Sequence, residues 1–204
     1  MARSFAHWTP RYLTRRLQLL IHENLHPDDP WLTAAAVQFL DDNLNRQMVG
    51  VECGSGRSTI WTARRIQRLV SLEHSSEWHQ RVSSKLRAQG ITNVTYHLRP
   101  DPEKYVDELR RMPDSSVDFM LVDGIERDRC FQEGSRIVKS GGLLVLDNAN
   151  WYTAHNTYSP ASVPVGTILN EGQWPIITDA ISSWLYFWTS NGVTDTAIFL
   201  KPPM

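Results

Sequence analysis

Five short apolar runs that alternate with helix-like stretches constrain the fold of this chain more than any other feature. The runs occupy residues 47–53, 69–73, 93–98, 117–123 and 140–148. Strands that alternate with helices indicate parallel pairing, because consecutive parallel strands need a crossover connection. The interiors VSL, FMLV and LLVL are almost wholly apolar, as expected for strands covered on both faces. The sequence therefore predicts an α/β fold with a doubly wound, Rossmann-like sheet.

The remaining segments extend this sheet at both ends. Helices are predicted over residues 10–24, 31–44, 58–68, 77–89, 102–112, 127–139 and 175–183, with a long loop over 149–175. Two closing runs, 183–190 and 195–202, flank Asn191-Gly192, a pair typical of a tight hairpin turn. We therefore expect a mostly parallel sheet of seven strands that ends in a C-terminal antiparallel hairpin.

Length and composition limit the function classes. A chain of 204 residues fits one domain, predicted to span 1–204 with residues 1–45 as an N-terminal helical extension. A net charge of -1 does not favour a nucleic-acid partner. Cys53 and Cys130 form no paired motif, and no run approaches the roughly 18 apolar residues of a membrane span. These features predict a cytoplasmic protein without a membrane segment, and they leave a homo-oligomer open.

Carboxylates follow four of the five predicted strands. Glu52, Glu73, Asp123 and Asp147 stand at the ends of the first, second, fourth and fifth runs. Ligands of open parallel sheets bind at the carboxyl ends of the strands. The pattern therefore predicts a ligand site at this edge of the sheet.

The loop after the first strand indicates which ligand the site takes. In VECGSGRST, Gly54 and Gly56 let the backbone approach a ligand closely, but Thr59 stands where a dinucleotide fingerprint needs a third Gly or an Ala. A diphosphate would be repelled by Glu52, whereas an amino group would be attracted. Glu73 lies about 20 residues downstream, where a carboxylate bridges ribose hydroxyls. An amine and a ribose in one ligand indicate an aminoacyl-type nucleoside.

These segments resemble a known family. VECGSGRST, LVSLEH, VDFMLVDG and SGGLLVLDN are similar to successive motifs of the class I S-adenosylmethionine-dependent methyltransferases, and GSGRST with LEH resembles small bacterial members. The resemblance covers about residues 48–148. It implies that S-adenosylmethionine is held by Glu52, Gly54, Ser55, Gly56, Ser58, Thr59, Glu73, His74 and Asp123. In this reading Glu52 and the glycine loop surround the methionine moiety, Glu73 holds the ribose, and His74 lies against the adenine.

A narrower resemblance concerns a metal. The catechol and caffeoyl-CoA O-methyltransferases hold a divalent cation with an Asp after the fourth strand and an Asp-Asn pair after the fifth. Asp123, Asp147 and Asn148 occupy those places, and their oxygen atoms suit Mg²⁺. The sequence departs from that pattern at Glu126, where the catechol-type enzymes have a lysine.

The predicted function is methyl transfer from S-adenosylmethionine to a small-molecule acceptor, with oxygen as the target atom. An oxygen acceptor needs a base, for which Asp123 and the loop residue His155 are the candidates. Two alternatives remain open. One is a non-catalytic cofactor-binding protein of the same fold, and the other is a nicotinamide-dependent oxidoreductase, which Glu52 and Thr59 disfavour.

Overall fold

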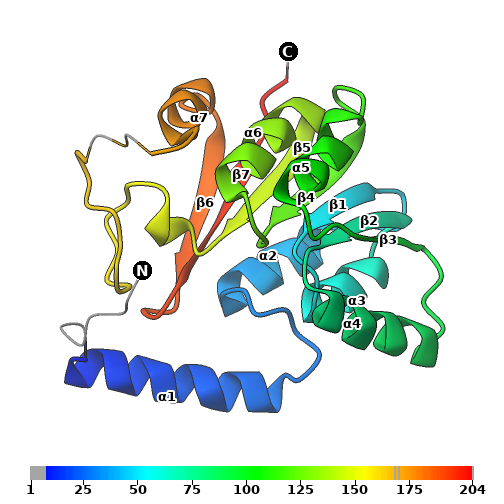
Figure 1. The fold of residues 1–204 in the computed structure, drawn as a ribbon. Coiled ribbons are helices and arrows are strands. Elements are labelled where there is room, and N and C mark those ends of the chain that lie inside the picture. Colours follow the sequence, from blue (N-terminus) through cyan, green and yellow to red (C-terminus); the bar gives the residue numbers. More distant parts are fainter. Residues whose placement is uncertain (1–7, 168, 170, 204) are drawn as a thin grey trace.

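The strands form one seven-stranded sheet, in the order β3-β2-β1-β4-β5-β7-β6 (Figure 1). The computed structural model describes residues 8–167, 169 and 171–203. The strands are β1 (Val49–Cys53), β2 (Arg68–Glu73), β3 (Val94–Leu98), β4 (Val117–Val122), β5 (Val138–Asp147), β6 (Leu185–Ser190) and β7 (Asp195–Leu200). β1 to β5 pair in parallel, while β7 is antiparallel to β5 and β6. The predicted doubly wound sheet and its closing hairpin are confirmed.

Helices cover both faces of the sheet. They are α1 (Pro10–Leu25), α2 (Ala34–Asn43), α3 (Arg57–Ala63), α4 (Ser76–Ala88), α5 (Pro102–Arg110), α6 (Arg127–Ile137) and α7 (Trp174–Ala180), with a 3-10 turn η2 (Ala149–Trp151). Residues of α5, α6 and α7 share one core cluster with Met120 and Val122 of β4. Residues of α2 and α3 share the other with Phe119 and Leu121. Alternate residues of β4 therefore face opposite cores, which explains why its sequence is apolar throughout.

Several helices end earlier than the sequence predicts, α3 and α6 among them. α3 ends at Ala63, not near residue 68, and the Asn93 side-chain amide donates to the carbonyl oxygens of Ala63 and Ile66 at 2.8 and 3.1 Å. A distant side chain thus satisfies carbonyl groups that a longer helix would have used. α6 ends at Ile137, because Val138 is fully buried and already pairs with Val117 in the sheet.

The two helices before the sheet differ in how they are held. α2 buries Ala36, Val37 and Leu40 in the core, whereas none of the residues of α1 is buried. α1 runs from the β6–β7 turn, where Arg15 contacts Gly192, to the loop after β1, where the Arg57 guanidinium donates to the Glu23 carbonyl oxygen (Figure 1). Among the described residues, no helix has the length and hydropathy needed to cross a membrane.

Candidate functional site

The carboxyl ends of β1, β2, β4 and β5 meet at one edge of the sheet, as the sequence predicts. The Gly54 N–H donates to the Leu72 carbonyl oxygen at 2.9 Å, and the Asp123 N–H donates to the Cys53 carbonyl oxygen at 2.8 Å. These bonds hold the loop after β1 between the ends of β2 and β4. The predicted site residues of those three strands are therefore neighbours in space.

Glycine is required where the loops after β1 and β4 cross. Gly54 has φ +90°, and a Cβ atom there would lie 2.7 Å from the backbone nitrogen of Gly124. A Cβ on Gly124 would meet the Tyr105 hydroxyl and would lie 2.8 Å from the Gly54 nitrogen. Side chains at either position would push the two loops apart. This crossing places Asp123 directly beside the glycine loop.

Glu52 is a buried carboxylate that is only half paired. Its Oε2 atom accepts hydrogen bonds from Thr59 Oγ1 at 2.6 Å and from Ser71 Oγ at 2.8 Å. Its Oε1 atom is buried and has no hydrogen-bond partner among the described residues. Burial raises the pKa of Glu52 from 4.5 to about 7, while the hydroxyl donors oppose the shift. An unpaired carboxylate oxygen at this position suits a ligand that carries an amino group.

Glu73 organises the backbone on the ribose side of the predicted site. Its Oε2 atom accepts from the N–H and hydroxyl of Ser55 at 3.1 and 2.7 Å. Its Oε1 atom accepts from the N–H groups of His74 and Ser75 at 2.9 and 2.8 Å. The His74 ring lies beside it, with Nδ1 3.1 Å from Oε1. Ser55, Glu73 and His74 are thus brought together, and the His74 ring is exposed beside the Glu73 carboxylate.

The ends of β4 and β5 meet around Arg127, which was not among the site residues predicted from the sequence. Its guanidinium donates to the side-chain oxygens of Asp123 at 2.8 Å and of Asn148 at 3.0 Å. It also donates to the carbonyl oxygens of Gly124, Asp123 and Asp147 at 3.0, 2.8 and 2.5 Å. These five bonds match the five N–H donors of a guanidinium. Arg127 therefore ties the end of β4 to the end of β5.

Asp147 belongs to the same cluster but faces the closing hairpin. It is 4% exposed, and its Oδ1 atom accepts from Thr196 Oγ1 at 2.8 Å. Burial and the charge of Asp123 raise the pKa of Asp147 to about 8. Burial also raises the pKa of Asp123, although Arg127 opposes the shift and the side chain remains 34% exposed. The two carboxylates are close enough to affect each other, as the sequence predicts.

The residues at this position do not fit a divalent cation. The predicted ligands Asp123 and Asn148 each give a side-chain oxygen to the Arg127 guanidinium, and Asp147 gives its carboxylate to Thr196. A fixed positive charge therefore stands among the atoms that a metal would need. Within the described part of the chain, no three His, Cys, Asp or Glu side chains are grouped to hold a metal. The predicted magnesium is not confirmed.

Glu126 and Arg127 have different roles, although they are adjacent. Glu126 has φ +51° and accepts from Arg129 Nη1 at 3.1 Å, so it is neutralised outside the cluster. Arg127 is the residue that reaches inward. Two convergent carboxylates require a cation, and Arg127 is the first one after Asp123 in the sequence, a signal that could have identified it.

His155 lies apart from this cluster, in the wall of a cavity. Its ring stacks on Trp188, with centroids 4.1 Å apart, and its buried Nδ1 atom has no described hydrogen-bond partner. The cavity, of about 570 Å³, is mainly apolar and includes Ile181 and Phe199. Among the described residues, no hydrogen bond links His155 to Asp123 or Asp147.

Comparison with known proteins agrees with this fold. Residues 49–146 match the methyltransferase domain family. A Corynebacterium glutamicum protein superposes with a TM-score of 0.61 at 12% identity, covering 94% of this chain and 91% of that one. A candidate caffeoyl-CoA O-methyltransferase from Staphylococcus aureus gives 0.57 at 13% identity, with 97% and 95% covered. A SAM-dependent methyltransferase from Aquifex aeolicus gives 0.53 at 16% identity, with 84% and 93% covered.

The fold and the glycine-loop site define a Rossmann-like methyltransferase. No curated protein matches the sequence significantly. At such low identities the structural neighbours establish the fold alone, and the family match adds the activity class. Together, the family match over residues 49–146 and this fold support an enzyme of the class I S-adenosylmethionine-dependent methyltransferases.

Proposed function

We propose that this enzyme transfers the methyl group of S-adenosylmethionine to an oxygen atom of a small-molecule acceptor, without a divalent metal. Asp123 carries this proposal. It stands beside the glycine loop, one of its oxygens is held by Arg127 at 2.8 Å, and its side chain remains one-third exposed. A carboxylate that is both anchored and accessible is suited to accept a proton from an acceptor hydroxyl.

The cofactor is proposed to bind along the edge formed by Glu52, the glycine loop and Glu73. S-adenosylmethionine supplies the methyl group from its sulfonium centre. The unpaired Oε1 of Glu52 suits the amino group of the methionine moiety, and Glu73 suits the ribose hydroxyls. Because Ser55 already donates to Glu73 at 2.7 Å, the ribose would share or displace that bond. Ser58 and Thr59 would support the cofactor from the start of α3.

The contribution of the protein would be mainly alignment and exclusion of water. Arg127 fixes Asp123 and Asn148 by hydrogen bonds and leaves no donor unused. It therefore acts as a positioning residue rather than as an acceptor ligand. His155 stacks on Trp188, so we propose Asp123 rather than His155 as the base.

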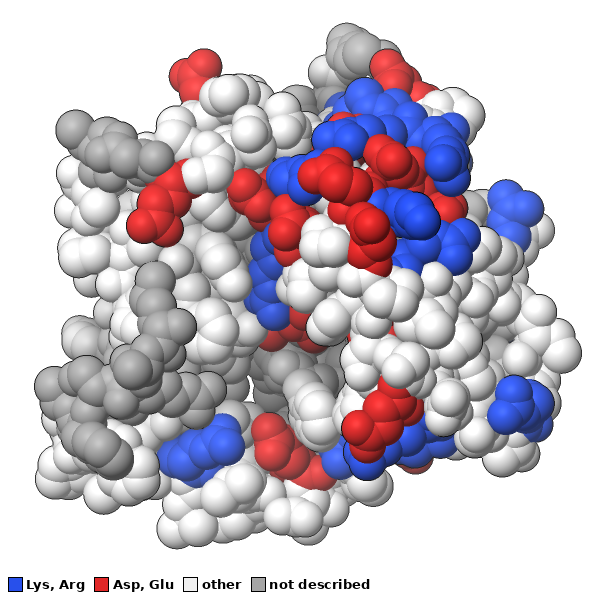
Figure 2. Space-filling view, in the orientation of Figure 1, with Lys and Arg blue, Asp and Glu red and all other residues white. Residues whose placement is uncertain are grey.

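A small acceptor agrees with the charge distribution in the view of Figure 2. Lys, Arg, Asp and Glu side chains are interleaved over α5 and α6 at the upper right, where Arg129 pairs with Glu103 and Arg136 with Glu133. A nucleic-acid surface would need basic residues without such partners. We also propose that residues 1–204 work as one unit, with residues 1–45 as its N-terminal extension.

The test combines binding with turnover. S-adenosylhomocysteine should raise the melting temperature, whereas NAD should not. Incubation with methyl-labelled S-adenosylmethionine and hydroxylated small molecules in EDTA should yield O-methylated products by mass spectrometry. Asp123→Asn should abolish these products and retain S-adenosylhomocysteine binding. Turnover that disappears in EDTA and returns with Mg²⁺, or products methylated only at nitrogen or carbon, would contradict the proposal.

A further inference from the structure

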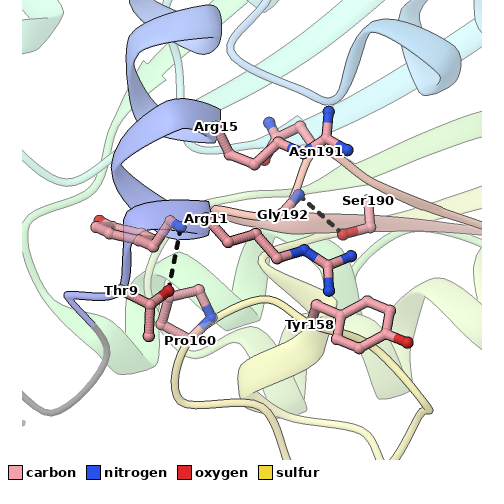
Figure 3. A pocket seen from close by; sticks show the side chains of 9 residues that line it. Thr9, Arg11, Arg15, Tyr158, Pro160, Ser190, Asn191 and Gly192 are labelled. Carbon is pink, nitrogen blue, oxygen red and sulfur yellow. Dashed lines mark hydrogen bonds between the residues drawn. The ribbon is translucent and has the colours of Figure 1, made fainter.

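A second cavity, with polar side chains in its lining, lies where α1 meets the β6–β7 hairpin (Figure 3). It has a volume of about 400 Å³. One wall is the start of α1, with Arg11 and Arg15, and the opposite wall is the turn from Ser190 to Gly192. Tyr158 from the loop after β5 closes a third side. Three segments distant in the sequence therefore form the cavity.

Within the described part of the chain, neither arginine of this cavity has a carboxylate partner. Arg11 stacks over the Tyr158 ring, with its guanidinium carbon 3.9 Å from the ring centroid, and Arg15 donates only to Gln18 at 3.1 Å. None of the described acidic side chains forms an ion pair with either residue, and none lines the cavity. By contrast, most arginines of α5 and α6 have such partners. Arg11 and Arg15 thus present two uncompensated positive charges to one space.

The turn adds further donor capacity, and the neighbouring Asp195 is hydrogen-bonded within the protein. Asn191 Oδ1 accepts from the N–H groups of Val193 and Thr194, each at 2.9 Å, which leaves the amide N–H₂ group of Asn191 free to donate. Asp195 is fully buried below the turn and already accepts from Ser159 at 2.5 Å and Trp188 at 2.9 Å. Both of its carboxylate oxygens therefore accept hydrogen bonds from neutral side chains rather than from the arginines of the cavity.

The cavity is connected to the acceptor end of the site by the hairpin. The Asn191 N–H donates to the Thr194 carbonyl oxygen at 3.2 Å, and Thr194 Oγ1 accepts from Asn148 Nδ2 at 2.6 Å. Asn148 is held in turn by Arg127. A hydrogen-bonded path therefore joins the turn of the cavity to the end of β5, where the acceptor is expected.

We propose that this cavity binds an anionic group, a carboxylate, sulfate or phosphate, and that in the proposed function this group is the anionic end of the methyl acceptor. Guanidinium groups bind such oxyanions through paired hydrogen bonds. The Tyr158 ring beside Arg11 favours a planar or aromatic body next to the charge. This inference rests on the proposed function for the identity of the ligand, but not for the site itself.

The test uses phenyl phosphate as the probe and phenol as its uncharged counterpart, titrated by calorimetry. Arg11→Ala/Arg15→Ala should weaken phenyl phosphate binding by roughly tenfold or more, because both charge-assisted contacts are lost. The control Arg16→Ala/Arg46→Ala removes the same charge from exposed positions outside the cavity and should leave binding unchanged. Phenol should bind no more weakly to the first variant than to wild type. Equal phenyl phosphate affinity in all three proteins would overturn the proposal.

Two further measurements distinguish the small-anion site from a membrane-binding surface and from the proposed function. α1 also exposes Leu13, Leu17 and Ile21, so vesicles of phosphatidylglycerol are tested in parallel. Arginine-dependent capture by vesicles without phenyl phosphate binding would overturn the small-anion site in favour of a membrane surface. S-adenosylhomocysteine affinity is measured on the same samples and should be equal in all of them. A wild type that binds phenyl phosphate through Arg11 and Arg15 but no S-adenosylhomocysteine would support the anion site and contradict the proposed function.

Discussion

Thr59 Oγ1 donates to the buried Glu52 Oε2 at 2.6 Å and accepts from the Gly56 N–H at 2.9 Å. One hydroxyl therefore joins the glycine loop to the carboxylate beneath it. The same residue breaks the dinucleotide spacing, since a third glycine would leave both groups without this partner. Thr59 thus both replaces the third glycine of the dinucleotide fingerprint and provides a hydrogen-bond partner for Glu52.

We expect Thr59→Val to destabilise the protein by about 1–3 kcal/mol, because Glu52 and Gly56 each lose a buried hydrogen bond. Thr62→Val is the matched control. Thr62 is buried on the same helix, and its hydroxyl makes no side-chain hydrogen bond to a described residue. Urea unfolding of both variants measures the difference. If Thr59→Val and Thr62→Val cost the same free energy, the hydroxyl bridge contributes nothing specific.

Glu52 should make stability depend on pH between about 4.5 and 7. Its pKa is raised in the folded protein, so the unfolded chain ionises first as the pH rises above 4.5. Stability therefore falls through this window, by roughly 3 kcal/mol, and levels off above pH 7. Glu52→Gln should remove this part of the curve. Asp147 titrates over an overlapping range, so the difference between wild type and variant is the quantity to compare.

Cofactor binding should also be coupled to the ionisation of Glu52. It should release a proton, whereas folding takes one up. If an amino group pairs with Glu52, the bound state favours the carboxylate, and S-adenosylhomocysteine binding below pH 7 should release a proton. Calorimetry in two buffers of different ionisation enthalpy detects that proton. Proton release that persists in Glu52→Gln would assign it to another group.

We expect Glu73→Gln to weaken S-adenosylhomocysteine binding by about 2–3 kcal/mol, because hydrogen bonds to a charged group are the stronger ones. Glu77→Gln is the control, since Glu77 is exposed and pairs only with Arg81. Melting temperatures are needed as well, because Glu73 also accepts from backbone N–H groups of the loop. An unchanged dissociation constant in Glu73→Gln would remove this residue from the site.

The sheet and the cofactor edge could be predicted because their signals are local. Apolar runs mark the strands, and Glu52, Glu73, Asp123 and Asp147 follow them directly in the sequence. Parallel pairing then brings these residues to one edge without any knowledge of side-chain contacts. The positive φ of Gly54 likewise follows from its residue type and place in a turn.

What the sequence did not reveal depends on long-range contacts. The early end of α3 is set by Asn93, about 30 residues away, which caps carbonyl groups of the segment after Ala63. The role of Arg127 depends on the meeting of β4 with β5, which brings Asn148 within 3.0 Å of its guanidinium. The family resemblance favoured a metal at this place, because the oxygen ligands can be recognised in the sequence, whereas their contacts with the Arg127 guanidinium cannot.

Arg127 provides the sharpest test of a site without metal. We expect Arg127→Met to lower stability by roughly 3 kcal/mol, because Asp123 and Asp147 are then left close together without a cation. Arg129→Met is the control, and it should cost far less, since Arg129 pairs with the exposed Glu103 and with Glu126 outside the cluster. The variant, unlike wild type, should regain stability with Mg²⁺, because the freed oxygens of Asp123 and Asn148 can then hold it. Melting curves with EDTA and with Mg²⁺ measure this response. A wild type that Mg²⁺ stabilises as much as it does the variant would show that Arg127 does not take the place of the ion.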